Sequence, residues 1–271
     1  MENHVSWITQ LVNHIFGRFA LALLSALHVK SSNPETPIPE HVVMAMLVLI
    51  TGTLFALFLR SRLSVDRPGA SQQVAEFLIT NPLSFGIRDI LRDNAGHHSE
   101  KHIPVVGSVS IFILLSNLFG VVPILSSPTA SATVPFACAI ITFLYFNLQG
   151  ARHHGPVGYV KHFAGPVWWL SPLMLPVEIL STTARLLSLT VRLWANIFAS
   201  DMIYGLFLGL FAGPAIWGWA KNPVLGVILG VLPALIPLAF IALHIFVSVI
   251  QTYVFTILPA VYIGMATADG H

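Results

Sequence analysis

Three observations predict an all-α, polytopic membrane protein with about five membrane helices. Only 9% of the 271 residues are charged, whereas roughly a quarter is usual in soluble domains. Hydrophobic residues make up 55% of the chain, and its mean hydropathy is +0.80. Several uncharged stretches approach or exceed the roughly 20 apolar residues that a helix needs to cross a bilayer.

The charge and cysteine content exclude several classes of function. The formal net charge is only +2 and the 13 Lys and Arg residues are scattered, so the chain lacks the basic surface that binds nucleic acid. The single cysteine, Cys138, excludes an intramolecular disulfide and a thiolate metal cluster. A phosphate-binding glycine loop followed by Lys and Ser or Thr does not occur in the sequence, so we expect no direct nucleotide binding. Neither a cofactor nor a metal site is predicted.

The N-terminal part predicts one surface helix and one span. Residues 5–28 mix apolar residues with Asn13, His14 and Arg18, a pattern typical of a helix lying in the membrane interface. We therefore expect residues 1–40 to form an extracytoplasmic segment with an interfacial helix, left uncleaved because its apolar stretch lacks a basic leader. Residues 41–59 are predicted as the first membrane span, because residues 42–59 contain no charge.

The middle of the chain predicts a polar loop and two more spans. Residues 60–102 are expected to form a cytoplasmic loop, in which the amphipathic pattern of residues 72–93, broken at Pro82, predicts surface helices. Residues 103–151 contain no Asp, Glu, Lys, Arg or His. This run is interrupted near Pro123 and Pro128, so two spans joined by a tight turn are predicted.

The distribution of basic residues predicts the orientation. Eight of the 13 basic residues lie either between the first two predicted spans or just after the third: Arg60, Arg62, Arg67, Arg88, Arg92, Lys101, Arg152 and Lys161. Cytoplasmic loops carry such an excess of Lys and Arg. The N-terminus is therefore expected outside and the C-terminus in the cytoplasm.

Two long helices are predicted in the last hundred residues. The apolar stretches 173–212 and 222–268 each exceed a perpendicular span, since 40 helical residues reach about 60 Å. We expect these helices to tilt, bend or break in two. They are expected to pack as a hairpin whose Gly-, Pro- and Trp-rich turn, residues 212–223, lies at the outer interface.

Ionisable residues inside these two helices indicate an ion route. Such groups cost roughly 2.5 to 3.5 kcal/mol each at membrane depth, so they normally face protein or water. On a helix advancing about 100° per residue, Asn196 and Glu178 both lie about 40° from Arg192, whereas Asp201 points nearly opposite to Arg192. Asp201 is therefore expected to face the protein interior, toward the following helix.

The last predicted helix continues the polar track. His244 and Gln251 are seven residues apart and so share one face of that helix. Together with the groups of the preceding helix, they form a track from a carboxylate near the cytoplasm, past a fixed cation, to a carboxylate and an imidazole nearer the outside. We therefore expect residues 103–268 to form an ion-translocating membrane domain.

Several motifs resemble one family. The segment RLWANIFASD, residues 192–201, is similar to the motif R-L-x-G-N-x-x-A-G-E of subunit a of F-type ATP synthases. HIFVSVIQTYVFTILPAVYIGMA resembles that family's C-terminal helix, and SNLFGVVP, residues 116–123, resembles the N-L-x-G-x-x-P end of an earlier span. Glu178 and Arg185 also stand at the family's spacing before the arginine. The resemblance covers residues 100–268.

The resemblance implies a stator subunit that is not itself an enzyme. It would conduct protons through two offset half-channels to and from a c-ring, with Arg192 separating the half-channels. The implied partners are the c-ring, the b subunits of the peripheral stalk and the lipid membrane, and the expected location is the bacterial plasma (inner) membrane. The residues implied in the ion pathway are Glu178 on the cytoplasmic side, Asn196 and Gln251 in the polar track, and Asp201 with His244 on the outer side.

The sequence departs from the family pattern at several positions of this track. Asp201 is one methylene shorter than the usual Glu, and Trp194 replaces the usual Phe. The other departures are Ala195 and Ser200, where glycine is common, and Ser131 and Thr133, where Asp or Asn is common.

Other interpretations of these residues remain open at this stage. Arg192 could be the counter-ion of a secondary permease for a small anionic solute, although the chain lacks the internal repeat of many transporters, or it could belong to a buried ion pair. Asp201 and His244 could be a structural bridge in a membrane scaffold, and Glu178 could simply lie at the interface. The polar groups of residues 97–102, namely His97, His98, Glu100 and His102, are interpreted as solvated surface residues rather than metal ligands.

Overall fold

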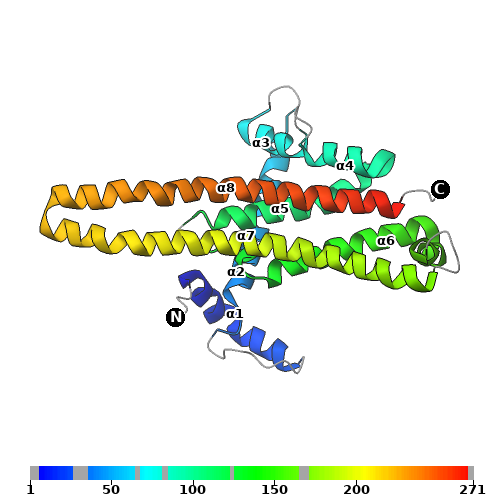
Figure 1. The fold of residues 1–271 in the computed structure, drawn as a ribbon, viewed down its shortest axis with the longest axis horizontal. Helices are drawn as coiled ribbons and strands as arrows, with labels where there is room; N and C mark the ends of the chain where they lie inside the picture. The colour runs from blue at the N-terminus through cyan, green and yellow to red at the C-terminus, as the bar shows by residue number, and fades with distance from the viewer. Residues whose placement is uncertain are drawn as a thin grey trace. The chain divides into compact units, whose positions relative to one another are not determined.

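Within the residues that it describes, the computed structural model is built of helices, as predicted (Figure 1). It describes residues 6–26, 36–64, 68–80, 85–122, 125–164 and 171–267. The chain divides into two compact units. Unit 1 comprises residues 1–50, 115–134 and 194–249, and unit 2 comprises residues 51–114, 135–193 and 250–271. Each unit is therefore assembled from segments that are far apart in sequence.

Five helices are long and apolar enough to cross a membrane, as the sequence predicts. They are α2 (Glu40–Ser61), α5 (Ile103–Phe119), α6 (Thr133–Ala164), α7 (Ser171–Lys221) and α8 (Pro223–Thr267). Except in α5, many of their described large apolar side chains are exposed in the isolated chain. Leu54 of α2 is 61% exposed and Leu180 of α7 is 70% exposed. Such faces are favourable against lipid, whereas a soluble protein would bury them.

Helix α1 (Trp7–Ala26) is the amphipathic helix predicted near the N-terminus. The Asn13 amide donates hydrogen bonds to the carbonyls of Thr9, at 2.9 Å, and Ile38, at 3.0 Å, and its oxygen accepts from the Ile38 amide at 2.9 Å. The segment before α2 is thereby fastened to α1. Apolar residues occupy the exposed side of α1, namely Trp7, Leu11, Ile15, Phe16 and Phe19. Its place in the membrane interface stays a prediction.

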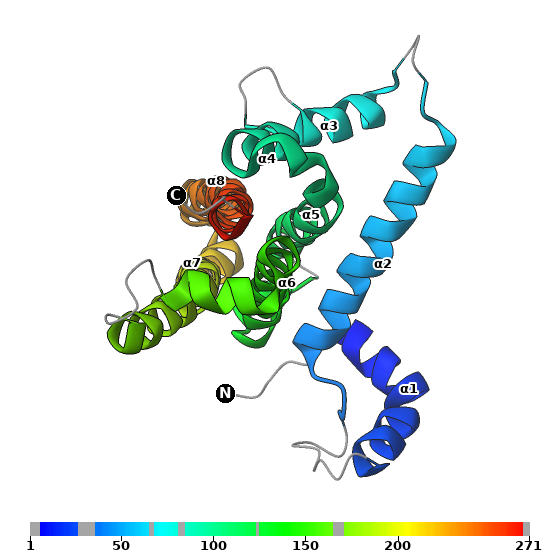
Figure 2. The ribbon, with the colours of Figure 1, turned by 90° about the vertical axis from the view of Figure 1, so that its right-hand side faces the viewer.

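The segment between α2 and α5, in which amphipathic helices are predicted, contains two short helices and a 3₁₀ helix. They are α3 (Ala70–Ile79), α4 (Ile87–Ala95) and η1 (Gly96–His102), and Figure 2 shows the chain passing from α3 through α4 into α5. The predicted break at Pro82 falls outside the described residues. Ile87, Ile90 and Leu91 of α4 are buried in the core of unit 2. An ion pair of 3.1 Å between Arg88 and Glu100 joins α4 to η1.

Helix α6 contains a bend at Gly155. Its backbone has a φ of 73°, a left-handed conformation that L side chains rarely adopt, so α6 is two helical segments joined at this residue. A second glycine of the same helix allows a close contact, because a Cβ at Gly150 would overlap the ring of Tyr159. In the second half of α6, Gly155 thus allows the bend and Gly150 allows the close contact with Tyr159.

The connection from α5 to α6 is longer than the predicted tight turn. It spans residues 120–132 and includes the short helix η2 (Pro128–Ala130). Ser127 and Thr129 are buried in it, and their hydroxyl oxygens lie 2.7 Å apart. Pro128, one of the two prolines that suggested a turn, instead begins the 3₁₀ segment η2, and Pro123 lies outside the described residues.

The predicted turn over residues 212–223 is wrong in extent, because α7 continues as a helix to Lys221. Gly and Pro are turn signals in water, but backbone groups in an apolar medium are best satisfied inside a continuing helix. The chain reverses at Asn222, whose side chain accepts a hydrogen bond from the Val224 amide at 2.9 Å. Asn222 therefore acts as the N-cap of α8, with Pro223 at the first helical position, where a missing N–H is tolerated.

On the two sides of Asn222, α7 and α8 run antiparallel in unit 1 and form a long hairpin (Figure 1). The rings of Phe207 and Phe240 stack with their centroids 4.8 Å apart and an interplanar angle of 22°. The hairpin predicted from the two apolar stretches is therefore present between residues 194 and 249.

Gly264 of α8 allows α4 to approach closely in unit 2. A Cβ at this position would overlap the backbone carbonyl oxygen of Asn94. We expect Gly264→Ala to displace α4 and lower the free energy of unfolding by about 1 to 3 kcal/mol, as overpacking does elsewhere. Thermal unfolding in detergent would measure this effect. The control is Gly209→Ala, because no atom lies within 4 Å of a Cβ added there; equal stability of the two variants would contradict the close approach.

Candidate functional site

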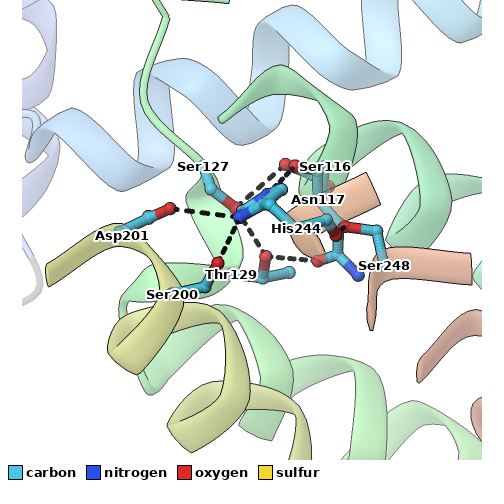
Figure 3. Close-up of polar contacts among 8 residues, drawn as sticks. All are labelled: Ser116, Asn117, Ser127, Thr129, Ser200, Asp201, His244 and Ser248. Carbon is cyan, nitrogen blue, oxygen red and sulfur yellow. Dashed lines mark hydrogen bonds and ion pairs between the residues drawn. The ribbon is translucent and has the colours of Figure 1, made fainter. Parts of the chain in front are cut away.

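His244 is the centre of a polar cluster in unit 1 (Figure 3). Its ring nitrogen Nδ1 lies 2.8 Å from the hydroxyl of Ser200 and 3.6 Å from a carboxylate oxygen of Asp201. Its other nitrogen, Nε2, lies 3.0 Å from the backbone carbonyl oxygen of Asn117. Asp201 therefore points toward the following helix, as the helical spacing predicts. The imidazole contacts both a titratable group and two neutral ones.

The Asn117 side of this cluster is held by hydroxyl groups. Thr129 donates a hydrogen bond of 2.6 Å to the side-chain oxygen of Asn117, and Ser127 donates one of 3.0 Å to the carbonyl of Ser116. All four residues are buried. Gly120 lies beside them, and a Cβ there would come within 3.4 Å of His244 Nε2. The end of α5 and the following connection thus form a rigid wall for the imidazole.

Trp194 ties α7 to the same connection. Its indole N–H donates a hydrogen bond of 3.0 Å to the carbonyl of Ala130, and its ring stacks on Phe198 with centroids 5.6 Å apart. A phenylalanine could stack in this way but has no donor. The departure at position 194 therefore adds a link between α7 and η2. Nearby, Ser131 and Thr133 are 3.4 Å apart through their hydroxyls.

A small cavity adjoins Asp201 and His244. Its volume is about 10 Å³, roughly the space for one water molecule. The residues that line it are Gly120, Val121, Asp201, Tyr204, Phe240, Ile241 and His244. Both titratable members of the cluster therefore adjoin a space large enough for a water molecule.

Arg192 lies on an exposed face of α7. Arg192 and Asn196, one turn apart, are both exposed, whereas Leu193 and Ile197 are 1% and 0% exposed. Arg192 makes no ion pair with any other residue in the described part of the chain. The alternative of a buried internal ion pair is therefore contradicted. Arg192 is thus a permanent cation on an exposed face of an apolar helix.

Glu178 and Arg185 form an ion pair in unit 2, two helical turns apart on α7. Their closest charged atoms are 3.7 Å apart, and the Arg185 guanidinium lies over the ring of Tyr262, 5.2 Å from its centroid. Burial raises the pKa of the nearby Tyr159 hydroxyl, and the charge of Glu178 raises it further. Arg185 therefore pairs with the Glu178 carboxylate.

The remaining predicted pathway residue, Gln251, is on α8. It is 7% exposed and His244 is 6% exposed, in accord with their placement on one face of this helix. Gln251 belongs to unit 2 and His244 to unit 1. Burial of an amide side chain within an apolar helix requires hydrogen-bonding partners, so Gln251 is suited to a polar track.

The expectation that residues 97–102 are solvated is wrong for one of them. His102 is only 1% exposed, and its ring nitrogen Nδ1 lies 2.9 Å from the hydroxyl of Tyr145. It is buried because η1 leads directly into α5, where the chain enters the core of unit 2. The side chains of His97 and His98 lie outside the described set. Among the described residues, no group of three or more His, Cys, Asp or Glu could hold a metal ion.

Sequence reasoning missed Ser200 and Thr129 as members of the cluster. Ser200 stood out only as a departure from glycine, and Thr129 was hidden in a segment interpreted as a turn. A usable signal was available for Asn117, which belongs to the motif SNLFGVVP. Contacts of this kind depend on how four separate segments meet, which spacing along one helix does not reveal.

Comparison with known proteins gives consistent matches over most of the chain. The family model described as ATP synthase A chain matches residues 41–264. ATP synthase subunit a of Koribacter versatilis (strain Ellin345) is 38% identical over 268 residues, which cover 99% of each chain. The protein of the same name from Solibacter usitatus (strain Ellin6076) is 38% identical over 241 residues, covering 88% of this chain and 91% of the relative. ATP synthase subunit a 3 of Pelobacter propionicus is 30% identical over 257 residues, covering 95% and 98%.

The contact with Asn117 predicts which nitrogen of His244 carries the proton in the neutral ring. A carbonyl oxygen only accepts hydrogen bonds, so Nε2 must donate and Nδ1 must be the free acceptor. We expect ¹⁵N solid-state NMR of the complex in lipid to give the Nε2–H tautomer for His244, with the signal assigned by its loss in His244→Gln. Detection of the Nδ1–H tautomer would contradict this geometry.

Proposed function

The chain belongs to the ATP synthase subunit a family, the membrane-sector subunit of F-type ATP synthases, and we propose that it conducts protons to and from the c-ring through two offset half-channels. Arg192 separates these half-channels. Glu178 serves the cytoplasmic one, Asp201 and His244 serve the outer one, and Asn196 and Gln251 belong to the polar track. The complex has its catalytic nucleotide chemistry in other subunits.

The observation that carries this proposal is the exposure of Arg192 without an ion partner among the described residues. A permanent charge at membrane depth costs several kcal/mol unless it finds an opposite charge or water. An ion-binding carboxylate on a neighbouring chain meets this need, and the ring of c subunits supplies one at each step of rotation. The exposed face of α7 that carries Arg192 and Asn196 is accordingly the surface for the ring.

Arginine suits this position because it cannot relay protons. Guanidinium stays protonated in proteins, so it holds the carboxylate of the ring ionised and blocks direct passage from one half-channel to the other. Each proton that crosses a 100 mV potential releases about 2.3 kcal/mol. A residue able to pass protons at this point would lose that energy as leak. A fixed cation prevents the loss.

The geometry around His244 supports the outer half-channel. Asp201 and His244 are both titratable, they are 3.6 Å apart, and both line the cavity of about 10 Å³. A proton can therefore pass between water, a carboxyl group and an imidazole over short distances.

The position of Glu178 along α7 supports its assignment to the cytoplasmic half-channel. Glu178 is 23 residues before Asp201 on the continuous helix α7, which corresponds to about 34 Å at 1.5 Å per residue. This length is comparable with the hydrocarbon thickness of a bilayer. The excess of basic residues in residues 60–102 and 152–161 favours an N-terminus outside and a C-terminus in the cytoplasm of a bacterium. The b subunits of the peripheral stalk are proposed as further partners.

Substitution of Arg192 tests the proposal directly. We expect Arg192→Ala to reduce ATP synthesis in proteoliposomes to background while the complex still assembles, because the residue makes no internal ion pair that folding requires. Arg192→Lys should also fail, since an ammonium group can release its proton and guanidinium does not. Arg60→Ala, at the exposed end of α2, is the control. Parental ATP synthesis in Arg192→Ala would overturn the proposal.

Accessibility to thiol reagents tests the offset of the half-channels. In a Cys138→Ser background, which removes the single buried native thiol, we expect Glu178→Cys to react with a membrane-impermeant maleimide added from the cytoplasmic side. Asp201→Cys should react only from the other side. Labelling of both cysteines from the same side would show that they share one aqueous compartment and would refute the offset.

A further inference from the structure

We propose that Ser200 is a positioning residue of the outer half-channel, whose hydroxyl holds the imidazole of His244 in place for proton exchange with Asp201. This inference rests on the proposed function. The Ser200 hydroxyl lies 2.8 Å from Nδ1 of His244, whereas the nearest carboxylate oxygen of Asp201 lies 3.6 Å from the same atom. Only the first distance is that of a hydrogen bond. Asp201 is close enough to attract a charged ring but not to orient a neutral one.

Because Nε2 of His244 is held by a hydrogen bond, Nδ1 is the ring nitrogen that can gain or lose a proton. Nε2 of His244 lies 3.0 Å from the Asn117 carbonyl, and a carbonyl cannot donate, so Nε2 keeps its hydrogen in both states of the ring. The wall formed by Asn117 and Thr129 is itself fixed by a hydrogen bond of 2.6 Å. The reactive nitrogen is therefore the one that faces Ser200 and Asp201.

A hydroxyl group is suited to this position because it both donates and accepts. When the ring is neutral, Ser200 donates its hydrogen to Nδ1. When the ring is protonated, Nδ1–H donates and the hydroxyl rotates to accept. A carboxylate can only accept, so Asp201 alone would leave the neutral ring without a partner at Nδ1.

The proton step itself involves two groups and one water molecule of the cavity that adjoins them. The O–H bond of the protonated Asp201 carboxyl breaks as its proton passes to the water, and the water gives one of its own protons to Nδ1 of His244, which leaves a carboxylate and an imidazolium. The reverse step returns the proton. Ser200 changes only the direction of its hydroxyl hydrogen. Tyr204, which lines the same cavity, and the uncharged Asn117 also face this region.

The geometry also accounts for two neighbouring departures from the motif at residues 192–201. Asp201 is one methylene shorter than the glutamate of that motif, and Ser200 stands in place of its glycine. A glutamate at position 201 could span the gap of 3.6 Å to Nδ1, and a glycine at position 200 would then suffice. The shorter acid and the added hydroxyl therefore compensate for each other.

The test compares ATP synthesis driven by an acid-to-base jump in proteoliposomes that contain the whole complex. We expect Ser200→Ala to lower the rate about tenfold, the size of effect of one lost hydrogen bond, and to change its dependence on the pH of the outer compartment. Ser200→Thr, which keeps the hydroxyl, should remain close to the parent. Ser61→Ala, which removes an exposed hydroxyl from α2, is the control.

The decisive variant combines Ser200→Gly with Asp201→Glu. We expect Ser200→Gly alone to be as slow as Ser200→Ala and the double variant to recover most of the rate, because the longer carboxylate takes over the contact with Nδ1. A rate and pH dependence in Ser200→Ala equal to the parent would overturn the inference. A slow double variant would overturn it too, since Ser200 would then act only through packing.

Two further variants separate this inference from the proposed function. Asp201→Asn keeps the size of the side chain but cannot titrate, and Arg192→Ala removes the fixed charge. If both variants synthesise ATP at the parental rate, the proposed function itself fails. If both are inactive while Ser200→Ala matches the parent, the proposed function stands and the role of Ser200 is refuted.

Discussion

The hydrogen bond from Nε2 of His244 to the carbonyl of Asn117 joins α8 to the end of α5, and the polar arrangement of unit 1 depends on it. Because this bond fixes one edge of the imidazole, the opposite edge must face α7. The residues that meet it there, Ser200 and Asp201, are then determined by the antiparallel packing of the hairpin. Thr129 reinforces the same contact from the connection between α5 and α6. One neutral hydrogen bond therefore positions the titratable groups.

Two arginines of α7 illustrate how the chain distributes its charges. Arg185 is satisfied internally, since it pairs with Glu178 and lies over the ring of Tyr262. Arg192, seven residues further along, is exposed beside the buried Leu193. The guanidinium charge is thus neutralised by a carboxylate at position 185 and exposed on the surface of α7 at position 192. The second arrangement is unfavourable for a lone chain in lipid, and the opposite charge that the proposed function places beside Arg192 would relieve it.

Much of the fold follows from the sequence because apolar length and charge are strong signals in a membrane protein. The spans α2 and α5 were predictable, as was the inward direction of Asp201, which needs only the helical repeat. The extent of α7 was not predictable, since Gly213 and Pro214 signal a turn in water but not in an apolar medium. The contact of Ser200 with His244 was also hidden. It requires the relative rotation of two helices, which local patterns do not encode.

The reversal at Asn222 has a consequence for how this hairpin can change length. Ser200 and His244 are each 22 residues from Asn222. The two arms of the hairpin, one from α7 and one from α8, therefore have the same number of residues between the tip and the Ser200–His244 contact. One residue added to a single arm would rotate everything beyond it by about 100° and shift it by about 1.5 Å. Ser200 would then turn away from the ring. Insertions and deletions near the tip are tolerable only as matched pairs, one in each arm. The lengths of the two arms therefore determine whether Ser200 lies opposite the imidazole, although the tip is far from it.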